Sequence, residues 1–210
     1  MMQTDLIIQR PATAEGAELL LLFHGVGSSA EDLAPLGQAL ASKRPNAWVV
    51  SARSPDQSDF GHGWQWFSVQ GVTEANRAQR VAAAMPSFLE RIVAWQKETG
   101  VTPQRTTLTG FSQGAIMALE STQLASQANS AARVIAIAGR FAQTPRLAPQ
   151  DVAIHLMHGE QDHVMPIQLA VDADQALRAL GAYSTLDRFS NLGHSIDSRV
   201  VDAIARRMAP

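Results

Sequence analysis

The sequence contains no cysteine among its 210 residues. That absence excludes disulfide bonds, metal sites built from thiolates and a cysteine nucleophile. An excess of one charge is lacking too, since 17 Lys and Arg residues nearly balance 19 Asp and Glu residues, for a formal net charge of −2. The charges are scattered along the chain, so nothing favours nucleic acid or an anionic membrane as a partner.

Long hydrophobic runs are also missing. The longest apolar stretches fall well short of the ~20 residues that a membrane span needs. The first residues place Asp5 before a very short apolar stretch and have no basic segment in front of it, so they do not read as a signal peptide. We therefore expect a cytoplasmic protein without stable membrane association, whose partner is a small molecule.

The composition that is present indicates a folded domain. Apolar residues make up 46% of the chain, which is enough for one sizeable hydrophobic core. We find no internal repeat, low-complexity tract or linker. The sequence therefore predicts a single domain over residues 1–210.

Short apolar runs alternate with segments of helical spacing along the whole chain. The expected strands are 5–9, 19–23, 47–51, 106–109, 133–138, 152–157 and 184–189, and the expected helices are 30–41, 75–100, 113–128, 167–180 and 195–208. This alternation predicts an α/β fold with a mostly parallel central sheet covered by helices on both faces. Only about a dozen residues separate the strands near 138 and 152, which is too few for a helical cap domain.

The most informative motif is Gly110-Phe111-Ser112-Gln113-Gly114, which follows an expected strand and opens an expected helix. A nucleophilic serine at a sharp strand-to-helix turn needs this context, because glycines on both sides relieve crowding at the corner. An ordinary turn with a serine cap is the alternative. The context favours Ser112 as an exposed nucleophile.

Three further motifs fall where strands of the sheet should end, and in a parallel sheet these ends carry the site. They are His24-Gly25-Val26-Gly27, the stretch from His158 to Asp162, and Gly193-His194. The chain order Ser112, Asp162, His194 is the order found in α/β-hydrolases and differs from that of other serine hydrolases.

With these motifs in place, the chain resembles the carboxylesterase/phospholipase family of α/β-hydrolases, which includes the acyl-protein thioesterases. The resemblance runs from end to end. It also includes Trp66-Phe67, and Gly-Phe-Ser-Gln-Gly is far more specific than the generic pentapeptide. Thioesterases usually continue His-Gly-x-Gly with Asp-Thr, whereas this chain has Ser28-Ser29. That departure places the chain nearer the bacterial carboxylesterases.

Chemistry and resemblance together suggest roles for five residues. His194 would take the proton of Ser112, and Asp162 would fix the tautomer of His194. The backbone N–H of Gln113, at the start of a helix, would donate to the oxyanion of the tetrahedral intermediate. The resemblance implies the N–H of Val26 as the second donor.

The stretch 53–73 is long, contains Gly, Ser and aromatic residues, and has no clear periodicity. Trp66 and Phe67 are predicted to wall an acyl pocket, with packing in the core as an equally weighted alternative. Trp64 is a weaker candidate for the same role, and Phe60 completes the cluster of four aromatic residues. Whether the stretch acts as a lid is left open.

The remaining acids and histidines have plainer explanations. Asp162 is preferred as the acid because it alone lies just beyond a strand end and between Ser112 and His194. The competing acids are Asp151, Asp172, Asp174, Asp187 and Asp197. His24 and His158 are expected to support their loops, His155 to lie in the core, His62 to be solvated, and His163 to lack further metal ligands.

We therefore expect a serine esterase that hydrolyses carboxylic esters of short to medium acyl chains, with thioesters or lysophospholipids as further substrates. No metal or cofactor is required. A serine peptidase or amidase of the same fold is one alternative, and a ligand-binding protein with a slow residual triad is another. A homodimer is left open.

Overall fold

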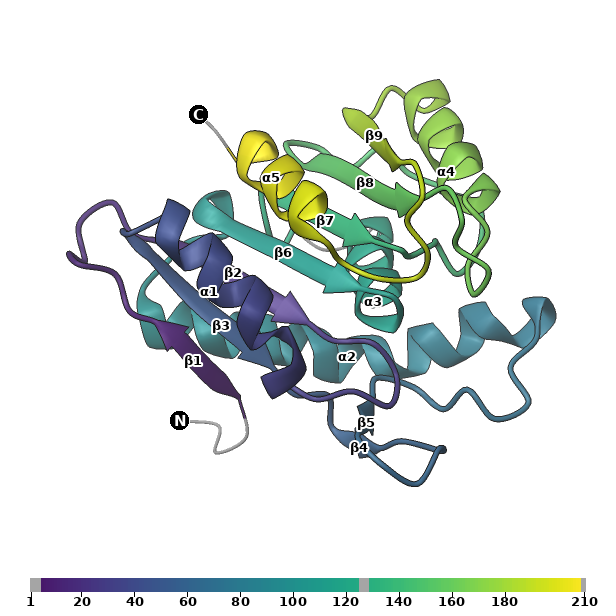
Figure 1. The fold of residues 1–210 in the computed structure, drawn as a ribbon, viewed down its shortest axis with the longest axis horizontal. Coiled ribbons are helices and arrows are strands. Elements are labelled where there is room, and N and C mark those ends of the chain that lie inside the picture. Colours follow the sequence, from purple (N-terminus) through teal and green to yellow (C-terminus); the bar gives the residue numbers. More distant parts are fainter. Residues whose placement is uncertain (1–4, 125–128, 209–210) are drawn as a thin grey trace.

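A seven-stranded sheet in the order β1-β3-β2-β6-β7-β8-β9 forms the centre of the computed structural model, which describes residues 5–124 and 129–208 (Figure 1). The strands are β1 Leu6–Gln9, β2 Glu18–Phe23, β3 Ala47–Ala52, β6 Thr106–Phe111, β7 Arg133–Ile137, β8 Ala153–Gly159 and β9 Ser184–Phe189. Only β1 runs antiparallel to its neighbour, and every other pair is parallel. The predicted mostly parallel sheet is confirmed.

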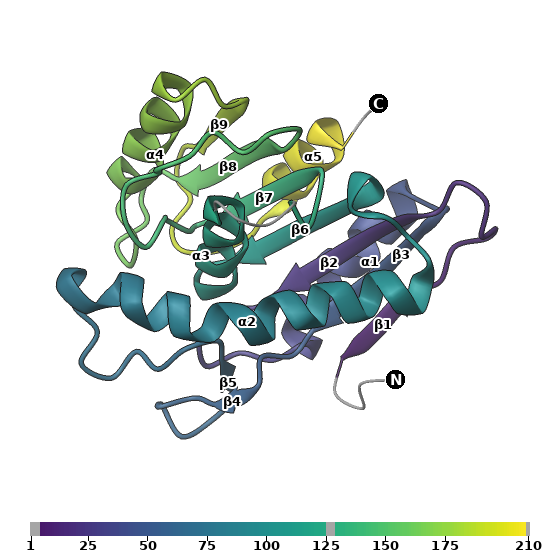
Figure 2. The same ribbon diagram turned by 180° about the vertical axis from the view of Figure 1, so that it is seen from behind.

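Helices cover both faces of this sheet, as predicted (Figures 1 and 2). On one face lie α1 Ala34–Lys43 and α5 Ser198–Arg207, and on the other lie α2 Glu74–Thr99, α3 Gln113–Glu120 and α4 Gln168–Ala179. Successive residues of β2 enter the two cores in turn, with Leu21 on the side of α2 and Leu22 on the side of α1. A strand buried on both faces needs a continuous apolar run, which is why Glu18–Phe23 reads ELLLLF.

Two predicted helices have different ends in the structure. The helix expected over 113–128 ends at Glu120 and continues as a 3₁₀ turn over Ser121–Gln123, and residues 125–128 lie outside the described residues. The hydroxyls of Ser121 and Thr122 donate to backbone carbonyls three residues earlier, which competes with the helical ladder. The helix expected from 195 begins at Ser198, because Asp197 caps it by accepting from two backbone N–H groups.

Two segments outside the central sheet differ in structure. Residues 138–152 contain no helix or strand, so no cap domain covers this edge of the sheet. The stretch 53–73 forms a small antiparallel pair, β4 Asp56–Gln57 and β5 Trp64–Gln65, which its lack of periodicity did not predict. Short 3₁₀ turns occur at Glu31–Leu33 and Pro103–Arg105.

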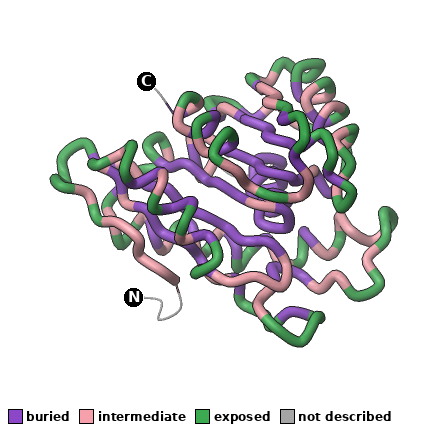
Figure 3. Tube along the Cα trace, viewed as in Figure 1, coloured by how far each residue is buried: buried purple, intermediate pink, exposed green. Residues whose placement is uncertain are grey.

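Burial follows this layout. Figure 3 shows the central strands buried for most of their length and exposed residues gathered at loops and on the outer sides of helices. Among the described residues, no helix combines the length and apolarity needed to cross a bilayer.

Candidate active site

Ser112 stands at the turn between β6 and α3 with φ 52° and ψ −114°, a conformation that side chains with a Cβ rarely adopt. Its N–H donates to the carbonyl of Ile137 at 2.9 Å, which ties the turn to the end of β7. The flanking glycines are required by close packing. A Cβ on Gly110 would collide with the backbone of Gly114, and one on Gly114 would collide with the carbonyl of Phe23.

A chain of hydrogen bonds joins the three residues that the sequence singled out. His194 Nε2 lies 3.0 Å from Ser112 Oγ, and His194 Nδ1 lies 2.7 Å from Asp162 Oδ2. The three side chains come from the carboxyl ends of β6, β8 and β9, which meet at one edge of the sheet. Because a carboxylate only accepts, Nδ1 carries the proton and Nε2 can accept the hydroxyl proton of Ser112.

The Asp162 carboxylate is fully buried and held on both oxygens. Its Oδ1 accepts from the backbone N–H groups of Val164 at 2.9 Å and Met165 at 2.8 Å. His158 Nε2 donates to the carbonyl of Met165 at 2.7 Å and lies 3.3 Å from Asp162 Oδ2. Burial lowers the pKa of His158, so this ring supports the acid loop in its neutral form.

The loop after β2 lies directly against the serine. A Cβ on Gly25 would stand 3.2 Å from the Cβ of Ser112. His24 Nδ1 donates to the carbonyl of Gly25 at 2.7 Å, while its Nε2 accepts the N–H of Ser54 at 3.1 Å. Burial lowers the pKa of His24, which matches this neutral tautomer. The bond fixes the Gly25–Val26 peptide, so the N–H of Val26 is directed opposite to the bonded carbonyl.

The two predicted oxyanion donors are available. Within residues 5–124 and 129–208, the N–H groups of Val26 and Gln113 donate to no other protein group. The carbonyl of Ser112 is instead engaged by Ala115 and Ile116, which fixes the orientation of the Ser112–Gln113 peptide. Gln113 is also the first residue of α3, where the helix dipole favours negative charge.

Trp66 and Phe67 lie in the larger of the two hydrophobic cores, with exposures of 2% and 6%. The Trp66 ring packs edge-on against Phe23 and Phe88, at centroid distances of 5.5 and 5.3 Å. Its Nε1 donates to the carbonyl of His24 at 2.9 Å. This packing favours the alternative that the two are core residues, and the acyl-wall hypothesis stays a prediction.

Sequence reasoning missed the part played by the Gln113 side chain. Its Oε1 accepts the N–H of Trp66 and its Nε2 donates to the carbonyl of Phe67, both at 2.7 Å. The only signal in the sequence was a polar residue inside an otherwise apolar helix start. Such a residue needs buried partners, but sequence alone does not say which.

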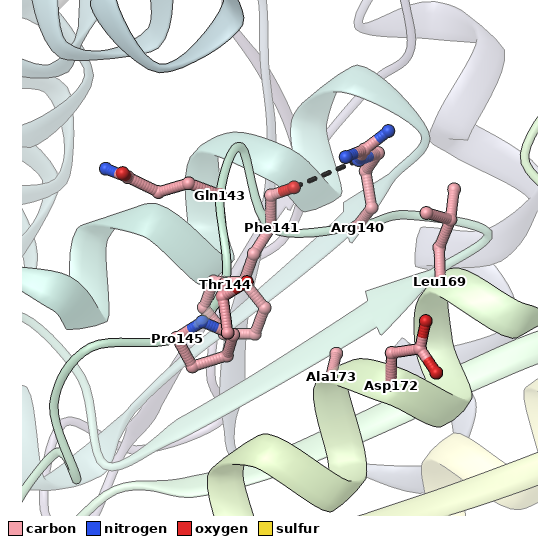
Figure 4. Close-up of a pocket in the computed structure, with 8 residues that line it drawn as sticks. All are labelled: Arg140, Phe141, Gln143, Thr144, Pro145, Leu169, Asp172 and Ala173. Atoms are coloured by element: carbon pink, nitrogen blue, oxygen red, sulfur yellow. Dashed lines mark hydrogen bonds between the residues drawn. The ribbon is translucent and has the colours of Figure 1, made fainter. Parts of the chain in front are cut away.

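A pocket of about 190 Å³ lies between the loop after β7 and α4 (Figure 4). Arg140, Phe141 and three neighbouring residues come from the loop, whereas Leu169, Asp172 and Ala173 come from the helix. Ser112, Asp162 and His194 do not line it. The Arg140 guanidinium is already paired with both oxygens of Glu74, so this cation is not free to bind an anionic substrate.

Three histidines outside the proposed triad lie in the core or at the surface. His62 and His163 are exposed, and His155 is buried with Nδ1 2.8 Å from Thr185 Oγ1. No set of three or more potential ligand side chains in the described part of the chain is placed to hold a metal ion. Phe60 is exposed rather than packed under its loop, and Trp64 stacks under the guanidinium of Arg53.

The serine lies at a strained strand-to-helix turn and is hydrogen-bonded to a histidine, which is bonded to an aspartate. Along the chain the three residues follow in the order Ser, Asp, His. This combination is typical of the α/β-hydrolase class. The chain belongs to the phospholipase/carboxylesterase family, whose family model matches residues 4–209. Esterase YpfH of Escherichia coli is 45% identical over 199 residues, which cover 95% of this chain and 84% of YpfH.

Solved structures agree with this family. The crystal structure of esterase PE8 is 27% identical, with a TM-score of 0.82 over 97% of this chain and 95% of that one. A carboxylesterase from Mesorhizobium loti shares the fold at 19% identity, with a TM-score of 0.75 over 91% of this chain and 88% of that one. By class, the chain is therefore a hydrolase of the esterase type.

Proposed function

We propose that the protein hydrolyses carboxylic esters of short to medium acyl chains through an acyl-enzyme intermediate on Ser112. The observation that carries this proposal is the continuous hydrogen-bonded series from Ser112 Oγ through His194 to Asp162. The esterase activity named for YpfH and PE8 supports the reaction class. Thioesters and lysophospholipids are further substrates within the same proposal.

In the first half of the reaction, Ser112 Oγ attacks the ester carbonyl and its proton passes to His194 Nε2. The carbonyl oxygen becomes an oxyanion, which accepts from the N–H groups of Val26 and Gln113. The intermediate collapses, the bond to the alcohol oxygen breaks, and the alcohol leaves with the proton from His194. Asp162 stabilises the imidazolium while it exists.

In the second half, a water molecule gives a proton to His194 Nε2 and attacks the acyl carbon. The bond to Ser112 Oγ then breaks, Ser112 recovers its proton, and the carboxylic acid is released. With no helix or strand in 138–152, no cap domain restricts access from this side, which suits soluble esters more than a deeply enclosed lipid.

The test is covalent labelling combined with a substrate series. A fluorophosphonate probe should label the protein once, peptide mapping should place the adduct on Ser112, and Ser112→Ala should abolish both labelling and turnover. Turnover of p-nitrophenyl esters of increasing chain length, an acyl-CoA and a lysophospholipid then defines the substrate. Labelling that persists in Ser112→Ala would refute the proposal, and faster hydrolysis of a matched anilide than of the ester would favour an amidase.

A further inference from the structure

Two oxyanion donors on separate segments stabilise the oxyanion together only if both N–H groups point at the same position. The Val26 N–H belongs to the loop after β2, and the Gln113 N–H belongs to the first residue of α3. Donors stabilise an oxyanion only when both lie about 3 Å from the position that it occupies, so a small relative shift removes much of their effect. Contacts that hold the two segments together are therefore candidates for a role in the reaction.

The segment 64–67 contacts both of these segments. On one side, Trp64 pairs with the loop after β2, since its carbonyl accepts from Gly27 at 2.9 Å and its N–H donates to Ser28 at 2.8 Å. The Trp66 indole adds its bond to the carbonyl of His24, two residues before Val26. Gly63 packs so closely on Gly27 that a Cβ there would collide with its backbone.

On the other side, both polar atoms of the Gln113 carboxamide bind the same segment. Oε1 accepts the Trp66 N–H and Nε2 donates to the Phe67 carbonyl, so one side chain holds the backbone of two successive residues. Gln113 is 2% exposed, and all three groups are shielded from water. Removing the carboxamide would leave the Trp66 N–H and the Phe67 carbonyl buried and unpaired. Because unpaired buried groups cost free energy, we expect the segment 64–67 to move relative to α3.

We propose that the Gln113 carboxamide and the Trp66 indole are positioning groups for the oxyanion hole, acting through residues 64–67 as a brace between its two halves. The inference rests on the proposed esterase mechanism. Gln113 then has two parts: its backbone N–H faces the substrate, and its side chain fixes where that N–H lies relative to Val26. Weakening the brace should impair stabilisation of the oxyanion while leaving substrate binding nearly unchanged.

The test compares an ester with its thionoester, in which sulfur replaces the carbonyl oxygen. Sulfur is a poor hydrogen-bond acceptor, so the thionoester gains less from the hole. Gln113→Met keeps an unbranched side chain and the backbone N–H but loses both amide bonds. We expect kcat for the ester to fall about 10- to 100-fold, with KM changed less than about threefold. The kcat for the thionoester should fall by a smaller factor, so that the ester-to-thionoester ratio of kcat decreases.

Gln123 offers a matched control. It is also a buried glutamine that clamps backbone, since Oε1 accepts from Arg146 at 2.7 Å and Leu147 at 3.0 Å. Gln123→Met should lower the melting temperature to a similar extent but leave the ester-to-thionoester ratio at the wild-type value. Trp66→Phe, which keeps an aromatic ring without the N–H, should narrow the ratio as Gln113→Met does. Trp66→Phe also tests the proposal if Gln113→Met does not fold.

The proposal is overturned if the positioning variants slow ester and thionoester by the same factor, or if they lower only the melting temperature. A ratio that narrows equally in Gln123→Met would overturn it too. Failure of the esterase mechanism looks different: Ser112→Ala would then retain turnover of the ester, whatever the ratio in the other variants.

Discussion

The two carboxylate oxygens of Asp162 have different hydrogen-bond partners. Oδ1 is committed to the backbone N–H groups of Val164 and Met165, and only Oδ2 faces His194. Three of the other candidate acids are occupied elsewhere: Asp197 caps α5, Asp187 pairs with Arg207, and Asp174 pairs with Arg178. The location of Asp162 just past a strand end singled it out in the sequence. The structure places its carboxylate beside His194, because loop position follows directly from strand position.

Asp162→Asn should reduce turnover by about 10⁴-fold. The two backbone N–H groups require an acceptor at the Oδ1 position, so the amide nitrogen must take the place of Oδ2. It then faces His194 Nδ1 as a donor, and the ring is forced to carry its proton on Nε2, where it can no longer accept from Ser112. Steady-state turnover checks this, together with a melting curve to show that the variant is folded. Nearly normal turnover would mean that another group orients His194.

At the level of elements, the stretch 53–73 is far more ordered than its sequence indicated. Asp59 accepts from the side chains of Gln65 and Ser68 and from two backbone N–H groups, and these hydrogen bonds lower its pKa to about 2. Sequence periodicity could not predict this, because the order comes from polar contacts at irregular spacing. A loop bonded internally in this way is a poor candidate for a lid.

Trp66→Ala should lower the free energy of unfolding by about 3–5 kcal/mol, because it removes a large buried ring from the core. The same variant should reduce kcat/KM by a similar factor for acetate, hexanoate and octanoate esters. Phe67→Ala gives the parallel test at the neighbouring position. Melting temperatures and specificity constants decide between the roles. A loss that grows with acyl length, about 0.8 kcal/mol for each methylene no longer buried, together with an unchanged melting temperature, would establish the acyl-wall hypothesis.

The α3 helix shows why the order of elements was predictable and the contacts of the site were not. Its start follows from the Gly-x-Ser-x-Gly motif, which is local. Polar side chains of α3 and of the 3₁₀ turn after it contact distant loops: Gln113, Glu120 and Gln123 bond to the backbone of Trp66, Ala142 and Arg146, which lie 47, 22 and 23 residues away. Nothing in the spacing of these residues identifies their partners, since those depend on how the loops pack over the sheet.

For the molecule as a whole, buried histidines make stability depend on pH. Burial, with the nearby charges of Arg133 and Arg207, lowers the pKa of His155 from 6.5 to about 4. Between these values the unfolded chain binds a proton that the folded chain does not, so stability falls as the pH falls from 6.5 to 4. His24 and His158, whose pKa values burial also lowers, act in the same direction.

The contribution of His155 to this loss should be about 3 kcal/mol over that range, from the size of its shift. Urea unfolding at several pH values between 4 and 7 should therefore show a shallower pH dependence for His155→Gln than for the wild type. The matched control is His62→Gln, which removes a histidine from an exposed position. An unchanged slope in His155→Gln would show that His155 titrates alike in the folded and unfolded chains.

The backbone at Ser112 has a consequence for how this protein can be made more robust. A residue with a Cβ at φ 52°, ψ −114° costs the fold on the order of 1–3 kcal/mol, and glycine would be free of most of that cost. Ser112→Gly should therefore melt at a higher temperature than Ser112→Ala, by an amount equivalent to about 1 kcal/mol, and higher than the wild type. Both variants would be inactive. The stability lost to this strain thus cannot be recovered at Ser112 without ending activity, so thermostable descendants must gain stability elsewhere in the chain.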